Sequence, residues 1–135
     1  MKKRQGKPSA WARVLDRQAY PPPEAGGGFR KEVLKRLRAS GSDTNLPHKF
    51  EFFLYLPTET AAETAAQRLR ESDFSAQVSH TGSGNGWLCR AEITLVPVTA
   101  SLDEIGLFFE QLAAALEGDF DGWESAVTPA KPKLG

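Results

Sequence analysis

The side chains best suited to chemistry in this chain are two histidines, one cysteine and seventeen carboxylates. His48 and Glu51 are three residues apart, a spacing that can join two metal ligands on a helix. The run HKFEFFLYLP instead alternates in polarity, which predicts a strand that Pro57 ends. Residues three apart on a strand point to opposite faces, so this pair cannot share an ion. We therefore expect no metal site, and we expect His80 to be exposed at the end of another strand.

The single cysteine lies in a second alternating run, Trp87 to Val96, at a position that faces the predicted core. Cys89 is therefore expected to be a small buried hydrophobe rather than a nucleophile. The stretch GSGNG lacks the Lys-Ser/Thr of a phosphate loop, and Asn85-Gly86 predicts a hairpin turn. No pair of carboxylates has a spacing that indicates acid-base catalysis. The sequence thus predicts a protein that is not an enzyme and that uses no cofactor.

The elements that position these residues follow a clear order. Residues 29–39 predict a helix that Gly41 ends, and Ser101 with Glu104 predicts a capping box at the start of a later helix. From residue 48 the predicted order is strand, helix, strand, strand, helix, strand. This order is typical of a ferredoxin-like α+β sandwich, in which two helices cover one face of a four-stranded antiparallel sheet. The helix at 29–39 precedes this core and is additional to it.

The other face of the predicted sheet is open unless something covers it. Phe53 and Tyr55 lie on that face, and we expect them to pack under the 29–39 helix or against a partner chain. RNA-recognition modules of this fold stack bases on aromatic residues from two central strands. The third strand, with Leu88 and Arg90, offers no aromatic residue there, so an RNA-binding sheet is disfavoured.

Charge is distributed unevenly although the net charge is zero. Residues 1–47 hold 11 Lys/Arg against 4 Asp/Glu, a net of +7, and residues 48–127 hold 4 against 13, a net of −9. Three prolines and three glycines within Pro21–Gly28 indicate a linker. We therefore expect a basic, disordered extension at 1–28, a domain at 29–127 and a flexible tail at 128–135. One cysteine and no long apolar run favour a cytoplasmic protein without a membrane partner.

Several short motifs together resemble one family. The stretches GSD, EFFLYLPTETAAETAAQRL, GWLC and GDFDGWE are similar in order and spacing to the ribonuclease E inhibitor RraB family of bacteria. The resemblance implies a ferredoxin-like fold and a non-catalytic protein that binds the endoribonuclease of the RNA degradosome and restrains its cleavage of transcripts. The residues that carry its motifs, which we expect to be structural, are Gly41, Asp43, Trp87, Asp121, Gly122 and Trp123.

The sequence is compatible with two alternative partner-binding surfaces. The first is acidic and would contact a ribonuclease through carboxylates of the two predicted core helices: Glu59, Glu63, Glu71, Asp73, Asp103, Glu104 and Glu110. The second is basic, and in this alternative the extension and the 29–39 helix contact RNA weakly while the acidic body binds protein. Within FDGWES, Phe120 and Trp123 are expected on opposite faces of the last strand, with Trp123 as a core anchor.

Deletion of residues 1–28 should leave the melting temperature of the remaining domain nearly unchanged. A Pro/Gly linker separates this extension from the helix predicted at 29–39, so the extension should add little packing. Thermal denaturation of the full chain and of the shortened chain checks this. A decrease of several degrees would show that Trp11, Val14 and Leu15 pack against the domain.

Overall fold

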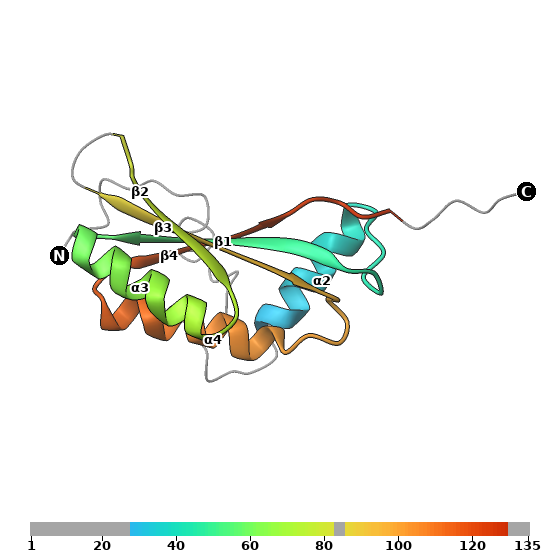
Figure 1. Cartoon of the computed structure of the whole chain (residues 1–135). Coiled ribbons are helices and arrows are strands. Elements are labelled where there is room, and N and C mark those ends of the chain that lie inside the picture. Colours follow the sequence, from blue (N-terminus) through green and yellow to red (C-terminus); the bar gives the residue numbers. More distant parts are fainter. Residues whose placement is uncertain (1–27, 83–85, 130–135) are drawn as a thin grey trace, which may run out of the picture.

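A computed structural model of the chain describes residues 28–82 and 86–129 (Figure 1). The predictions for the extension, for Asn85 in the hairpin and for the tail from residue 130 fall outside these residues. In chain order the elements are α2 (Gly28–Ala39), β1 (His48–Leu56), α3 (Glu59–Glu71), β2 (Ser75–His80), β3 (Trp87–Leu95), α4 (Leu102–Ala115) and β4 (Asp119–Ser125).

The four strands form one antiparallel sheet in the order β2-β3-β1-β4. Figure 1 shows α3 and α4 side by side along one face of this sheet. The predicted α+β class and the antiparallel sheet are confirmed, and the arrangement is compatible with a ferredoxin-like sandwich. As predicted, the last strand lies beside the first and forms an edge of the described sheet.

The core lies between the sheet and the helices. Phe52 is fully buried at the centre of β1, and its ring stacks on Phe109 of α4 with 4.6 Å between the ring centroids. Phe109 also stacks on Phe120 of β4 at 5.1 Å. The buried side of α3 consists of alanines and Leu69, and these small residues let the helix lie close to the sheet. Large aromatic rings under α4 and small residues under α3 therefore fill the same layer.

The two core helices begin differently. Thr58 caps α3, because its Oγ1 accepts a hydrogen bond from the backbone N–H of Ala61 at 3.0 Å. The capping box predicted at Ser101 is wrong, since the Ser101 side chain makes no capping hydrogen bond. The first turn of α4 keeps two acidic residues, Asp103 and Glu104, near its positive end.

The additional helix α2 packs beside α4. Phe29 lies against Gly106, where a methyl group in place of the glycine hydrogen would come within 2.7 Å of the Phe29 ring. Asp103 accepts a hydrogen bond from the backbone N–H of Arg30 at 2.9 Å, which satisfies one free donor at the start of α2. Because α2 belongs to the helix layer, it does not cover Phe53, and that part of the prediction is wrong.

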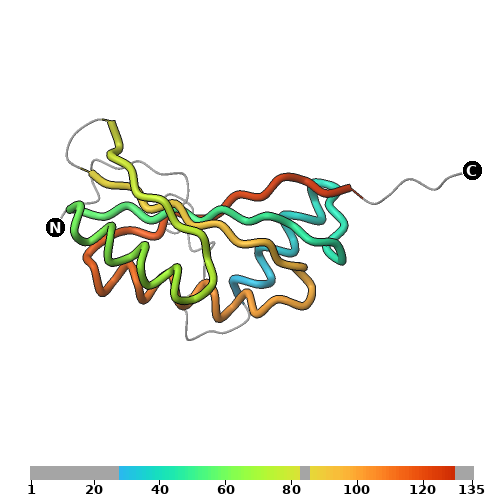
Figure 2. Tube along the Cα trace, in the orientation of Figure 1, coloured from blue at the N-terminus to red at the C-terminus, as the bar shows by residue number. Residues whose placement is uncertain are grey.

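The C-terminal end of α2 is tied to the end of the domain. Gly41 adopts a φ of +88°, and the N–H of Ser42 bonds the carbonyl of Leu37 at 2.9 Å, which ends the helix as predicted. Ser42 then pairs with Pro129 across an isolated bridge. Figure 2 shows the chain beyond β4 passing this end of α2.

A bulge in β4 overturns the prediction for FDGWES. Phe52 of β1 pairs with Trp123 and Leu54 pairs with Phe120, so one strand advances three residues while the other advances two. The extra residue is accommodated at Gly122, whose φ of +98° is costly for a residue with a side chain. Phe120 and Trp123 consequently lie on the same face, where Phe120 contacts Phe109 and the Trp123 ring lies 5.7 Å from Phe50.

Gly122→Ala should lower the free energy of unfolding by about 1–2 kcal/mol, because an L-residue is strained at this backbone conformation. Gly122→Asn should cost less than Gly122→Ala, since Asn tolerates positive φ better. Denaturant melts of both variants and the parent protein measure the difference. Equal losses for the two substitutions would show that space, not backbone conformation, requires glycine here.

Candidate partner-binding surfaces

A buried serine and histidine lie next to each other without forming a catalytic pair. His48 Nε2 lies 3.1 Å from Ser42 Oγ, and His48 Nδ1 lies 2.8 Å from the carbonyl oxygen of Leu46. Ser42 Oγ also accepts the backbone N–H of Thr128 at 2.9 Å. In the neutral ring Nδ1 therefore donates and Nε2 accepts from the serine hydroxyl, so each polar atom already has a structural partner. This cluster joins the start of β1, the end of α2 and the chain beyond β4.

Cys89 is fully buried under α3, as the sequence predicts. Burial raises the pKa of its thiol to about 11, an effect that Arg70 opposes and Glu63 adds to. The thiolate is the nucleophilic form, so this side chain is inert near neutral pH. In the described parts of the chain, no group of three or more His, Cys, Asp or Glu residues is placed to hold a metal ion.

The open face of the sheet carries paired charges. Arg90 of β3 lies 3.3 Å from Glu51 and donates to Gln77 at 3.0 Å, and Lys49 lies 3.7 Å from Glu92. These are the lysine and arginine residues of the four described strands, and each is paired with a carboxylate. Such pairing leaves little positive potential for a phosphate backbone on this face.

Tyr55 also lies on the open face, near the bulge. Burial raises the pKa of the Tyr55 hydroxyl above its ordinary value, and the negative charge of Asp121 is a second, smaller cause of the same shift. This shift favours the protonated, hydrogen-bonding form of the tyrosine. Tyr55 and Phe53 are both only partly buried.

The predicted acidic surface lies on the outer side of the helix layer. Glu59 and Glu63 project from α3, and Glu71 and Asp73 lie at the end of that helix. All four are exposed, as is Glu104 on α4. Asp103 and Glu110 are partly buried, and Asp103 is engaged by the backbone of α2. The carboxylates predicted to bind a partner thus include one with a structural task.

The motif residues occupy turns and ring contacts. Asp43 accepts the backbone N–H of Asn45 at 3.0 Å and donates its own N–H to Thr128 at 2.7 Å. The Trp87 ring meets the His80 ring edge to face at 4.8 Å. Gly122 allows the bulge that places Trp123 on the core side. Each of these residues fixes a junction between elements.

A protein-family model spans this whole arrangement. The model described as RraB, Regulator of ribonuclease activity B, matches residues 29–125, from the first turn of α2 to the last residue of β4. The chain belongs to the RraB family. The resemblance found in the short motifs is therefore confirmed. RraB is a family of regulators, and its description names an action on ribonuclease activity rather than a catalysed reaction. Among curated proteins, none matches this RraB-family chain.

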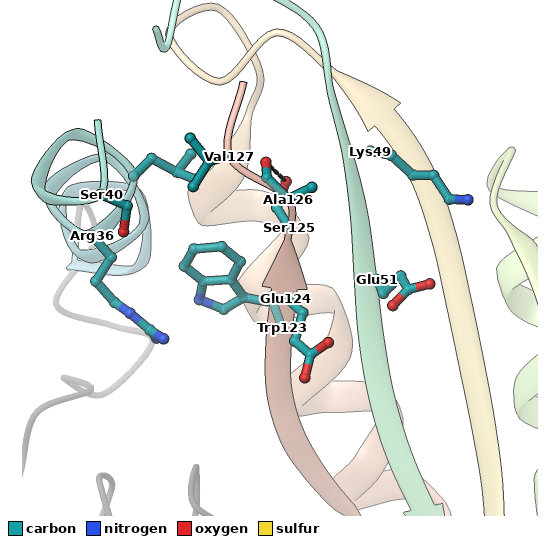
Figure 3. A pocket seen from close by; sticks show the side chains of 10 residues that line it. Arg36, Ser40, Lys49, Glu51, Trp123, Glu124, Ser125, Ala126 and Val127 are labelled. Carbon is teal, nitrogen blue, oxygen red and sulfur yellow. Dashed lines mark hydrogen bonds between the residues drawn. The ribbon is translucent and has the colours of Figure 1, made fainter. Parts of the chain in front are cut away.

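The sequence did not point to a groove at the free end of β4 (Figure 3). This groove has a volume of about 550 Å³. It is lined by Arg36 and Leu37 of α2 with Ser40 just after it, by Lys49 and Glu51 of β1, and by residues 123–127 at the end of β4 and just beyond it. The groove depends on Trp123 facing α2, which only the bulge permits. A regular strand pattern gives no signal of that position. Within residues 28–82 and 86–129, each helix is too short or too polar to span a bilayer.

Alkylation of the folded protein by iodoacetamide should rise about tenfold for each pH unit from pH 8 to 9.5 without levelling off. The raised pKa of Cys89 keeps the thiolate a minor species over this range. The same protein in urea is the control, because an ordinary thiol is half ionised near pH ~8.5 and its rate should level off above that value. Mass spectrometry measures the modified fraction. A plateau near pH 8.5 in the folded protein would contradict the buried environment.

Proposed function

We propose that this RraB-family protein binds an endoribonuclease of the ribonuclease E type and restrains its cleavage of RNA, without catalysing a reaction itself. The observation that carries this proposal is the family match, which extends over α2 and the entire sheet. The inert Cys89 and the fully engaged His48 agree with a binding role. The protein would then act in the cytoplasm, where the ribonuclease meets its transcripts.

The acidic outer side of α3 and α4 supports a basic region on the ribonuclease as the binding partner. Exposed carboxylates such as Glu63 and Glu104 lie in solvent, where they create a long-range negative potential. Complementary charge mainly raises the association rate and contributes less to the final affinity. The interaction should therefore weaken as salt screens these charges.

A second candidate function is an RNA-associated adaptor, in which α2 and the N-terminal extension contact RNA while the acidic body binds protein. One observation favours it: Lys31, Lys35, Arg36 and Arg38 are all exposed on α2. Phe29, Val33 and Leu37 of the same helix are buried in the core, so removing α2 would expose the core and destabilise the domain. The adaptor is better tested by the surface substitutions Lys31→Gln and Lys35→Gln.

Replacing Glu63, Glu71 and Glu104 by Gln should slow association with purified ribonuclease E several-fold at low salt, and the difference should shrink at moderate salt. These three residues are exposed, so the fold should persist. The control carries Ser75→Lys, Ser79→Lys and Thr94→Lys, which change the net charge equally on exposed positions away from the helices. Surface plasmon resonance measures both rates.

The same measurement with a generic RNA separates the two functions. If the protein regulates the ribonuclease, the parent protein should bind the ribonuclease and should inhibit its cleavage of RNA in the same concentration range. Tight RNA binding that Lys31→Gln and Lys35→Gln remove, with no detectable binding of the ribonuclease, would establish the adaptor instead.

A further inference from the structure

The groove between α2 and β4 holds a buried hydrogen-bond donor without an acceptor. Trp123 is 7% exposed, and its indole Nε1 has no hydrogen-bond partner among the described residues. An indole N–H can only donate, and a buried donor left unpaired costs about 1–3 kcal/mol. A ligand that brings an acceptor oxygen to this position would recover that energy.

A cation lies beside the same ring. The Arg36 guanidinium carbon lies 4.8 Å from the centre of the Trp123 ring, and Figure 3 shows the indole extending from β4 toward Arg36 and α2. Among the described residues, no carboxylate forms an ion pair with Arg36. A guanidinium and an adjacent indole N–H together fit a carboxylate, which can accept a hydrogen bond from each.

The outer edge of β4 favours a ligand in an extended conformation. β4 pairs with β1 on one side and forms an edge of the described sheet on the other. Side chains of an added strand would alternate between the two faces of the sheet. The groove matches this alternation, because Arg36 and Trp123 line it on the α2 side, whereas Glu51 and Lys49 line it from the open face. Val127, 47% exposed at one end, offers an apolar contact.

We infer that this groove binds an extended acidic segment of a partner protein, which adds to the edge of β4 and places a carboxylate between Arg36 and the Trp123 indole N–H. The basic residues around Arg36 on α2, Lys35 and Arg38, complement such a segment. The assignment holds whichever protein carries the segment, and it uses a surface distinct from the acidic sides of α3 and α4.

RNA fits this groove less well than a peptide does. Glu51 and Glu124 line it, and two carboxylates repel a continuous phosphate backbone. The Trp123 ring is buried with a guanidinium over it, so it offers no free surface on which a base could stack. An acidic peptide instead needs one carboxylate beside Arg36 and can direct neutral or basic side chains toward the glutamates.

The test titrates the full chain with a capped peptide of alternating Thr and Glu, while NMR follows the indole N–H signal of Trp123. Trp123→Phe identifies this signal by its loss and retains an aromatic ring in the core. We expect the Thr/Glu peptide to shift the signal at millimolar concentration or below, and matched Thr/Gln and Thr/Lys peptides to leave it in place. Arg36→Gln should weaken binding about tenfold, the effect of losing one charge-assisted hydrogen bond.

Two further variants make the result specific. Arg38→Gln removes the same charge from α2 at an exposed position outside the groove and should weaken binding much less than Arg36→Gln does. Val127→Asp adds a negative charge at an exposed groove position and should weaken binding with the fold intact. Equal effects of Arg36→Gln and Arg38→Gln, or equal shifts with all three peptides, would overturn the inference.

Two other occupants would also be revealed. A shift of the Trp123 signal with poly-uridine RNA but not with the Thr/Glu peptide would assign the groove to RNA and refute the acidic segment. A shift that grows with protein concentration alone, with dimers in sedimentation, would assign it to a second copy of the chain. Neither result would depend on whether the protein binds a ribonuclease.

Discussion

The register shift between β1 and β4 is the constraint on which the rest of this structure depends. Without the extra residue at Gly122, Phe120 and Trp123 would lie on opposite faces of the sheet. With it, Phe120 joins the stack of rings over β1, and Trp123 reaches the side occupied by α2. The additional helix α2 can dock there because both aromatic residues face it. The contact between β4 and α2 therefore depends on Gly122.

The helix layer is continuous as a result. Phe29 of α2 lies between Gly106 of α4 and Phe120 of β4, while the backbone N–H of Arg30 is held by Asp103. The sequence analysis assigned Asp103 to a partner-binding surface, but its carboxylate makes a hydrogen bond within the domain. The family match begins at Phe29, which agrees with α2 being part of the domain rather than an appendage.

Periodicity was enough to predict the strands, the helices and the buried position of Cys89. The spacing of apolar residues records which side of a regular element faces the core, and Gly41 and Thr58 mark helix ends through local hydrogen bonds. The side of the sheet on which α2 packs was not predictable. The apolar face of a helix shows which of its residues are buried, but not which other element buries them. The bulge was also missed, since a strict alternation of period two places Phe120 and Trp123 on opposite faces. The groove followed from that bulge and was hidden with it.

The strand order has a consequence for synthesis on the ribosome. β1 is made first among the strands but is central in the sheet, where its neighbours are β3 and β4. Both of its edges remain without partners until residues 87–95 and 119–125 have been translated. During that interval a nascent chain presents HKFEFFLYL, an aromatic-rich strand, to whatever is nearby, and unpaired strand edges of this kind favour aggregation. The alanine-rich α3 follows β1 directly. It is the first element made after β1 that can cover the apolar side of this strand before the remaining strands have been translated.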